Sequence, residues 1–542
     1  MKALLVWPKF SSFSFWNFEK VCELTGTKYM TPPLGLLTVA ALLPREWDLR
    51  VVDENVDPLT DADYGWADIV LVSSKIVHRQ RALSVIREAK KHGRPVVVGG
   101  PDPSLNPELY QGAGADYLCL DEGEATVPML LTDLALGAKQ GTYRTKTSPD
   151  LMASPVPRFD LIDHRDYLYL GLQYSRGCPH NCEFCNVIDL FEHKYRTKSL
   201  EQVLAEFQVV YDLGYRGQVD FFDDNLVGNV VKAKPFLKGL AAWLKDHGYP
   251  FTLSTSVTLN IAKDDELLVL LREARFNKLL VGIETPDEKA LKAAQKPQNT
   301  GFSVPEALDR IYRVSGCSVH SGFLLGLDQE ADDIGDQIIR CVDEGSVPWV
   351  MAGVVYPLPG TQLSKRLDRE GRLFPAARRF DDENVRDQIS AGVCFKPTRP
   401  AAKVLEDLVK VLHHSYDPVQ YFKRCAEAAV RLNVASNLFP GWNLFFRNIR
   451  TFLRLCFIAT TTSSMRGPFW KALWKVVFQN PAGIESLATL AVLFVHFNTM
   501  LPYCHEQLAK QRAAIRELGE ERWLEMNLRE PDQAQSARAA VG

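Results

Sequence analysis

The feature that most constrains this chain is a cluster of three cysteines, Cys178, Cys182 and Cys185, in a C-x3-C-x2-C spacing. The cluster follows an apolar run, residues 167–174, whose composition predicts a strand. Three thiolates this close in sequence can converge on one centre, and soft thiolates select zinc or iron–sulfur clusters. A structural zinc site usually takes four ligands from two cysteine pairs, and no second pair follows here. On a four-iron cluster, three thiolates would leave one iron open to a substrate or cofactor.

The residues around the cysteines sharpen this prediction. Arg176 and Gly177 precede the first cysteine, and Phe184 precedes the last one. The motif resembles that of the radical S-adenosylmethionine (radical SAM) enzymes. The resemblance implies that the three cysteines hold a [4Fe-4S] cluster whose open iron chelates the amine and carboxylate of SAM. One electron then cleaves SAM to a 5′-deoxyadenosyl radical. The competing interpretation is a set of three buried or redox-active cysteines.

Length and composition set broad limits. A chain of 542 residues predicts about three or four domains. The net charge of −3 carries no polyanion signature, so we expect no nucleic-acid partner. Eleven cysteines are too few for a disulfide scaffold, which favours a reducing, cytoplasmic location. The first residues run straight into a strand pattern without a signal-peptide profile, and no run of eighteen uninterrupted apolar residues predicts a spanning helix.

Residues 1–140 alternate short apolar strands with helical patterns. Such alternation predicts an α/β domain with a parallel, doubly wound (Rossmann-like) sheet, which binds ligands at the carboxyl ends of its strands. The predicted strands are 3–7, 49–53, 69–73, 95–101 and 117–120, and the clearest helices are 34–43 and 82–91.

This first domain resembles the cobalamin-binding domain that precedes many radical SAM domains. The resemblance rests on the segments 32–36, 99–101 and 122–124, and it implies cobalamin as a cofactor. The cofactor-binding candidates at the strand ends are Ser73, Ser74, Gly99, Gly100 and Glu122. The Asp-x-His-x-x-Gly signature of a histidine lower ligand is absent, so we expect base-off binding without a histidine. His78 follows the third strand, but a lone histidine there is more often a solvated loop residue than a cobalt ligand. The competing interpretation is a flavodoxin-like sheet that has lost its ligand.

A second α/β segment follows a predicted linker. Residues 141–165 are rich in turn formers and show no strand or helix period, which is typical of a linker. Residues 166–385 contain six apolar strands separated by helical patterns such as 200–213 and 233–247. The strands are 170–174, 218–222, 251–256, 278–283, 319–325 and 349–355. Six such repeats suit a partial (β/α)6 barrel, the fold that the radical SAM resemblance implies, with functional residues at the carboxyl ends of the strands.

Polar residues follow three of these strands, and the resemblance implies contacts with SAM. Asp223 and Asp224 follow the second strand, where a carboxylate suits the ammonium group of SAM, although Asp is also a common turn residue. Ser256 ends the third strand, where some relatives have a glutamate. Glu284 ends the fourth strand and would be a buried carboxylate, which needs a partner such as an arginine or a SAM hydroxyl.

The last part, residues 386–542, is helical in pattern. Between residues 428 and 484 there is no Asp or Glu, while seven Lys and Arg residues alternate with many aromatics. Basic and aromatic residues on helices favour contact with a membrane surface, and the competing interpretation is a helical cap with aromatics in its core. The apolar segment 487–494 is too short to span a bilayer, and the tail after Pro531 is expected to be disordered.

In order and content the chain resembles the cobalamin-dependent radical SAM enzymes, with hopanoid C-2 methylases among the relatives nearest to it. The resemblance implies methylation of an unactivated carbon, an electron donor such as flavodoxin or ferredoxin, and a small-molecule or lipid substrate. We therefore expect a cytoplasmic enzyme, peripheral to the inner face of the membrane if its substrate is a lipid. Three alternatives stay open: ring formation, transfer of the aminocarboxypropyl group of SAM, and an iron–sulfur electron carrier or sensor without enzymatic activity.

Overall fold

The computed structural model describes residues 1–529, except residues 11–13, 15, 146, 192, 380–388 and 436–441. The predicted disordered tail after Pro531 lies outside this range. The chain forms two compact units. The first consists of Met1–Gly177 and Leu190–Asp223, and the second of Cys178–Asp189 and Asp224–Gly542.

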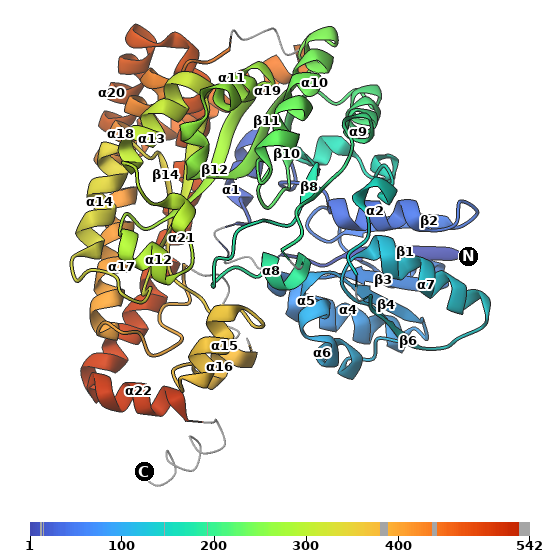
Figure 1. Ribbon diagram of the computed structural model, residues 1–542. Coiled ribbons are helices and arrows are strands. Elements are labelled where there is room, and N and C mark those ends of the chain that lie inside the picture. The colour runs from blue at the N-terminus through green and yellow to red at the C-terminus, as the bar shows by residue number, and fades with distance from the viewer. Residues whose placement is uncertain are drawn as a thin grey trace. The chain divides into compact units, whose positions relative to one another are not determined.

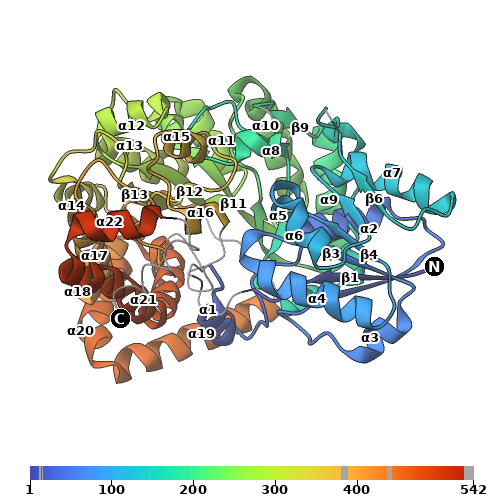
Figure 2. The ribbon, with the colours of Figure 1, turned by 90° about the horizontal axis from the view of Figure 1, so that it is seen from below.

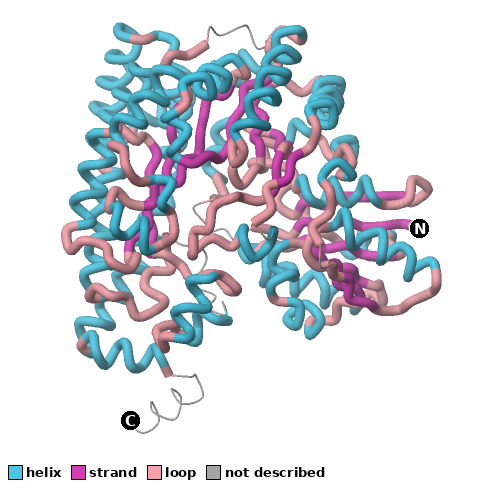
Figure 3. The backbone as a smooth tube through the Cα atoms, viewed as in Figure 1, coloured by secondary structure: helices cyan, strands magenta, loops and turns pink. Residues whose placement is uncertain are grey.

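The core of the first unit is a six-stranded parallel sheet (Figures 1 and 3). The strand order is β2-β1-β3-β4-β5-β6, a doubly wound arrangement that confirms the predicted fold class. Its strands are β1 Lys2–Trp7, β2 Asp48–Asp53, β3 Ile69–Ser73, β4 Val96–Gly99, β5 Tyr117–Cys119 and β6 Gly141–Tyr143. The helices are α1 Glu19–Thr25, α2 Leu34–Leu42, α3 Asp61–Trp66, α4 Arg79–Lys91, α5 Pro101–Leu105, α6 Pro107–Gly112 and α7 Gly123–Ala135.

Alternate residues of the strands fill two hydrophobic layers. Leu4 and Val70 pack with residues of α4 on one face, and Leu5 and Leu71 pack with residues of α2 and α7 on the other. Both faces of the sheet are therefore covered, which explains why its strands read as continuous apolar runs. One strand of this sheet was not predicted: β6 lies at the start of the expected linker and pairs with β5. Three residues are too few to show a strand period, but Tyr143 is buried in the core.

The rest of the first unit contains a second strand pair and a hairpin. β7 Leu170–Leu172 pairs in parallel with β10 Gly217–Phe221, as the apolar runs predicted, and α9 Leu200–Asp212 lies between them in sequence. β8 Ser175–Arg176 pairs antiparallel with β9 Arg196–Thr197. The segment between these two paired strands contains the cysteine loop and α8 Val187–Phe191.

The second unit contains four parallel strands in chain order. They are β11 Phe251–Thr258, β12 Phe276–Glu284, β13 Ser318–Leu325 and β14 Trp349–Val354. With β7 and β10, all six strands predicted for the partial (β/α)6 barrel are present. The helices between and after them are α10 Val230–Asp246, α11 Asp265–Glu273, α12 Glu288–Ala293, α13 Val304–Arg310, α14 Ile334–Glu344, α15 Gln362–Arg369 and α16 Pro375–Arg379.

The C-terminal part of the second unit is helical, as predicted (Figure 1, orange to red). Its helices are α17 Ala401–Tyr416, α18 Pro418–Arg431, α19 Trp442–Thr461, α20 Ser463–Gln479, α21 Ile484–Leu518 and α22 Glu520–Leu528. These helices share a core with the strands: the Tyr416 hydroxyl donates to the Val350 carbonyl at 2.7 Å, and Trp349 stacks on Phe497 of α21.

One helical stretch, Pro481–Leu518, is long and apolar enough in length and composition to cross a membrane. The sequence analysis predicted no spanning helix, because no uninterrupted apolar run is long enough. In the structure 56% of its most apolar window is buried, and the Leu490 carbonyl accepts a hydrogen bond from Tyr421 of α18. A core helix of a globular protein meets the same criterion, so the helix carries no argument for a membrane span.

Candidate functional site

The three cysteines of the motif lie on the loop that begins the second unit. All three are free thiols, with Cys182 buried and Cys178 and Cys185 half-buried. Burial raises the pKa of each thiol, and burial together with the neighbouring thiols Cys182 and Cys178 raises the pKa of Cys185 to about 12. Among the described residues, no group of three or more His, Cys, Asp or Glu side chains is arranged to hold a metal ion. The thiols are close enough to influence the pKa of one another.

Hydrogen bonds from two other segments fix this loop. The Glu183 carboxylate pairs with the Arg366 guanidinium of α15 at 2.8 Å, and the Glu183 carbonyl accepts the Leu363 N–H at the same distance. The Glu183 N–H donates to the Ala294 carbonyl at 3.2 Å, at the end of α12. These contacts hold the backbone beside Cys182 and Cys185 from both directions.

Glu284 lies at the end of β12 and forms a buried ion pair with Lys296. Burial alone would lower the pKa of Lys296, but the Glu284 carboxylate outweighs it and raises that pKa. Glu284 has a φ of 68°, which is unusual for a residue with a side chain and marks a constrained backbone. Gly282 leaves room for the pair, because a Cβ there would lie 2.8 Å from the Lys296 Nζ.

The ion pair and the cysteine loop lie next to each other. Burial raises the pKa of Cys182, and the Lys296 ammonium opposes this effect. The Gln298 side-chain amide donates to the Cys182 Sγ at 3.5 Å, and the Asn299 amide donates to the Gly282 carbonyl at 2.7 Å. The segment after α12 therefore connects the end of β12 to the thiols. Sequence analysis missed Lys296 and Gln298, because nothing in a polar loop sequence shows which way it folds back.

Of the carboxylates predicted after β10, Asp224 lies near the thiols, since its charge raises the pKa of Cys178 and Cys185. Asp223 belongs to the first unit and accepts a hydrogen bond from the Ser175 N–H. Asn225, which follows them, is buried, and its side-chain amide makes no hydrogen bond to any described residue. Its amide nevertheless lies close enough to the Cys178 thiol to lower the pKa of that thiol, so a polar side chain with hydrogen-bonding capacity left over lies beside Cys178.

The third strand end contributes less than expected. The Ser256 side chain is half-buried, and its carbonyl accepts the Leu226 N–H at 3.1 Å. The neighbouring Thr255 is buried, and its hydroxyl makes no hydrogen bond to a described residue. Asp224, Glu284 and the three cysteines are thus brought together, whereas Asp223 contacts the Ser175 backbone and Ser256 contacts the Leu226 backbone.

In the first unit, the predicted residues at the ends of β3 and β4 pack against each other. Gly100 has a φ of 106°, and a Cβ there would lie 2.7 Å from the Ser74 carbonyl oxygen. Gly99 lies close to β5, where a Cβ would be 3.1 Å from the Cys119 carbonyl oxygen. Ser74 is buried, and its hydroxyl lies 2.9 Å from that of Tyr110, while Ser73 is half-buried. Glycine is therefore required at position 100 for the two loops to meet at the carboxyl edge of the sheet.

Glu122, the fifth candidate in this unit, is engaged in ion pairs. Its carboxylate contacts Arg176 at 2.5 Å and Arg196 at 2.8 Å. Glu124 contacts the same Arg176 at 3.0 Å and accepts a hydrogen bond from Ser154. The Glu122-Gly123-Glu124 motif therefore binds both strands of the β8–β9 hairpin. The cysteine loop is part of the segment that connects these two strands.

His78 is not the solvated loop residue that we expected. It is 1% exposed and lies between the rings of Trp7 and Phe10, with centroid distances of 4.4 and 5.3 Å. Burial lowers its pKa to about 3, so the ring is neutral at physiological pH. The Nδ1 accepts the Lys75 N–H at 3.2 Å, which places the proton of the neutral ring on Nε2.

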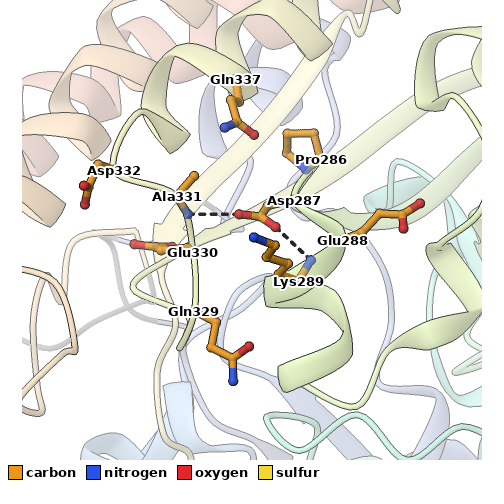
Figure 4. A pocket seen from close by; sticks show the side chains of 9 residues that line it. All are labelled: Pro286, Asp287, Glu288, Lys289, Gln329, Glu330, Ala331, Asp332 and Gln337. Carbon is orange, nitrogen blue, oxygen red and sulfur yellow. Dashed lines mark hydrogen bonds between the residues drawn. The ribbon is translucent and has the colours of Figure 1, made fainter.

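A pocket of about 640 Å³ lies beside the ends of β12 and β13 (Figure 4). Its lining is mostly acidic and amide side chains. The Asp287 carboxylate accepts the N–H groups of Lys289 and Ala331 at 2.8 and 2.9 Å, so it ties the two loops together. None of the predicted site residues lines this pocket, and no contact in it points to the predicted chemistry.

Three families match the chain in sequence. The B12 binding domain matches residues 24–131, the radical SAM superfamily matches 172–341, and a domain of unknown function (DUF4070) matches 361–510. An uncharacterized methyltransferase of Synechocystis sp. is 36% identical over 94% of both chains. The hopanoid C-2 methylase of Rhodopseudomonas palustris is 38% identical and covers 69% of this chain and 71% of its own length. The chain belongs to the cobalamin-dependent radical SAM methyltransferases.

Solved structures of cobalamin-dependent radical SAM enzymes share the fold of this methyltransferase. The enzyme OxsB, with aqua-cobalamin and SAM bound, aligns with a TM-score of 0.59 at 14% identity, over 97% of this chain and 83% of its own. The methyltransferase TsrM of Kitasatospora setae aligns with a TM-score of 0.55 at 17% identity, over 69% and 77%. The cofactors of the methyltransferase are therefore a [4Fe-4S] cluster, SAM and cobalamin.

The residues of the two units suit these groups. Three neighbouring thiols without a disulfide match a cluster that takes three protein ligands. The buried amide of Asn225, which lies beside Cys178, has hydrogen-bonding capacity left for a polar ligand such as SAM. The carboxyl edge of the first sheet, where Gly100 lets two loops meet, is the edge at which such sheets bind ligands.

Proposed function

We propose that this methyltransferase transfers a methyl group to an unactivated carbon of a hopanoid-like lipid. The observation that carries the proposal is the 38% identity to the hopanoid C-2 methylase, over 69% of this chain. Two bacteriochlorophyllide methyltransferases of Chlorobaculum tepidum are only 24% and 20% identical. A polycyclic hydrocarbon therefore has better support as the substrate than a chlorophyll-type ring.

When bound, the cluster, SAM and cobalamin supply one-electron cleavage of SAM and a transferable methyl group. In this proposal Cys178, Cys182 and Cys185 hold the cluster through their thiolates. Asp224 accepts hydrogen bonds from the ammonium group of SAM, because a carboxylate is the strongest acceptor for such a donor. Glu284, which Lys296 holds in place, contacts SAM from the end of β12.

The other predicted site residues are assigned to the two cofactors SAM and cobalamin. Asp223, which follows β10, and Ser256, near the end of β11, are further candidates for SAM contacts, and Asn225 is added to them because its buried amide lies beside Cys178. Toward cobalamin we assign Ser73, Ser74, Gly99 and Gly100 at the carboxyl edge of the first sheet. Glu122 reaches that edge as a positioning residue, because Arg176 and Arg196 already occupy its carboxylate.

The reaction also requires partners. One-electron cleavage needs a one-electron donor, for which a flavodoxin or a ferredoxin is suitable. A hopanoid-like substrate resides in a membrane, so we place the enzyme in the cytoplasm, peripheral to the inner face of the membrane. The basic and aromatic helices α19 and α20 support this placement.

The experiment is an anaerobic assay of the full chain, reconstituted with iron, sulfide and cobalamin, reduced with dithionite and given SAM with a trideuterated methyl group. The substrate is a hopanoid in detergent. We expect a trideuteromethylated lipid together with both 5′-deoxyadenosine and S-adenosylhomocysteine. Ring formation would release 5′-deoxyadenosine without S-adenosylhomocysteine, and aminocarboxypropyl transfer would release methylthioadenosine. Either of those patterns, or SAM cleavage without methylated lipid, would refute the proposal.

A further inference from the structure

Two C-terminal helices carry an unusual number of exposed apolar side chains. Those on α19 are Trp442, Phe446, Ile449, Leu453 and Phe457, and those on α20 are Trp474 and Phe478. Among the described residues, every Phe or Trp that is more than half exposed belongs to this set. All seven lie in the segment that matches the domain of unknown function. Contiguous exposed apolar side chains on a soluble surface usually mark an interaction site.

The five residues of α19 form a single stripe. They recur at intervals of four, three, four and four residues, which places them on one face of a helix. Trp442 stacks on Phe446 with a centroid distance of 5.8 Å, and Phe457 is 70% exposed. On the other side of the helix, Leu455 and Ala459 are fully buried. One face therefore anchors α19, which lies at the outer edge of the C-terminal helices (Figure 2), and a second apolar face remains uncovered.

Basic residues flank this stripe. Arg447, Arg450 and Arg454 follow one another at intervals of three and four, so they form a parallel row on the same helix. Arg450 and Arg454 are exposed, as is Lys471 on α20. Neither helix contains an Asp or Glu. The surface is thus apolar along its centre and positive along one side.

We propose that this surface, the α19 stripe with its basic flank, docks on an anionic lipid bilayer. Aromatic rings insert at the level of the lipid head groups, and each basic residue is attracted to an anionic leaflet. A helix with these two sides lies in the plane of the interface. The inference specifies the peripheral membrane contact of the proposed function and does not depend on which lipid is methylated.

Two other occupants fit the surface less well. A nucleic acid would use the arginines, but it leaves Ile449 and Leu453 without an apolar partner. A second copy of the chain would cover the apolar stripe, but it would bring the arginine rows of two copies together with no acidic residue on either helix. A bilayer with anionic head groups satisfies both features at once.

The test is co-sedimentation of the full chain with vesicles of phosphatidylcholine, with and without phosphatidylglycerol. We expect binding only to the anionic vesicles and a strong loss at about 1 M salt, where the Debye length falls to about 3 Å. The double variant R450Q/R454Q should bind roughly 30-fold more weakly at low salt, at about fivefold for each lost charge. The triple variant W442Q/F446Q/L453Q should lose binding even at low salt.

Matched controls remove the same groups elsewhere. R340Q/R516Q takes two exposed arginines from α14 and α21, and V231Q/V419Q/L136Q takes three exposed apolar residues from α10, from α18 and from the end of α7. Both controls should bind like the wild type. Equal losses in variants and controls, or no binding to anionic vesicles, would overturn the proposal. So would binding to a mixed-sequence oligonucleotide, or concentration-dependent dimerisation that the triple variant abolishes, if either occurs without vesicle binding.

A milder variant guards against misfolding of the triple variant. Trp442 is 65% exposed, so W442F leaves the fold intact. Brominated acyl chains should quench part of the tryptophan fluorescence of the wild type, and W442F should lack that part. Quenching that is identical in both proteins would contradict insertion of the stripe. Vesicle binding and quenching require no turnover. They can therefore fail while the enzyme still methylates a detergent-dispersed lipid, and they can succeed while it does not, so the two proposals fail separately.

Discussion

The carboxylate of Glu284 and the ammonium of Lys296 form a buried ion pair beside Cys182. Taking two charges out of water costs several kcal/mol for each ion, and only close pairing offsets that cost. Gly282 makes the close pairing possible, because its missing side chain leaves the space in which the pair lies. The ion pair therefore links the end of β12 to the cysteine loop.

Replacing Lys296 with Met should strongly destabilise the apo-protein. The substitution leaves the Glu284 charge buried and unpaired, so the free energy of unfolding should fall by about 3–5 kcal/mol in urea denaturation. The double variant E284Q/K296M should recover part of this loss. The exposed pair of Lys20 and Glu23 is the control, and K20M should change stability by about 1 kcal/mol or less. A K296M loss no larger than that of K20M would refute the assignment.

The sequence predicted that Glu284 is buried, but it did not predict that Lys296 is its partner. The strand before Glu284 is strongly apolar, which was enough to predict a buried carboxylate that needs a partner. The expected protein partner was an arginine, and the structure supplies Lys296, twelve residues later. That contact depends on how the loop after α12 folds back over the strand end. No local pattern encodes that path.

At the scale of elements, the Glu122-Gly123-Glu124 motif joins α7 to the β8–β9 hairpin. Burial alone would raise the pKa of Glu124, but the Arg176 guanidinium and the Ser154 hydroxyl lower it to about 2. The charged carboxylate therefore stabilises the folded state. Its contribution is complete above the ordinary glutamate pKa of 4.5 and is lost as the pH falls toward 2.

The variant E124Q should remove this pH dependence. The stability difference between wild type and E124Q should shrink by about 3 kcal/mol between about pH 5 and about pH 2, measured by denaturation of the apo-protein. The control is E108Q, an exposed glutamate on α6, which should track the wild type at both pH values. A difference that stays constant with pH would show that the Glu124–Arg176 contact does not lower the glutamate pKa.

The strands of both sheets were predictable because buried parallel strands read as uninterrupted apolar runs. β6 was not, because its three residues fall in a sequence rich in turn formers. The motif residue Glu122 was predicted as a cofactor contact from its place at a strand end. The structure shows ion pairs to Arg176 and Arg196, which are 54 and 74 residues away in sequence.

At the scale of the whole molecule, the C-terminal helices are part of the second unit and not an appendage. Arg399, just before α17, pairs with Glu330 after β13 at 2.6 Å and with Asp407 of α17 at 2.5 Å, and all three are buried. The sequence predicted helices here, but not that they complete the core next to β14. By contrast, the basic and aromatic composition of the region did predict the basic and aromatic side chains on the outer face of these helices.

The most direct measurement is the formation of 5′-deoxyadenosine by the full chain, reconstituted anaerobically with cobalamin and SAM and reduced with dithionite. The wild type should form 5′-deoxyadenosine. The triple variant C178A/C182A/C185A should lose the iron–sulfur absorbance and this product, and it should still show the spectrum of bound cobalamin. Formation of 5′-deoxyadenosine by the triple variant would contradict the assignment of the three thiols. A wild type with intact cluster absorbance that never cleaves SAM would contradict the radical chemistry itself.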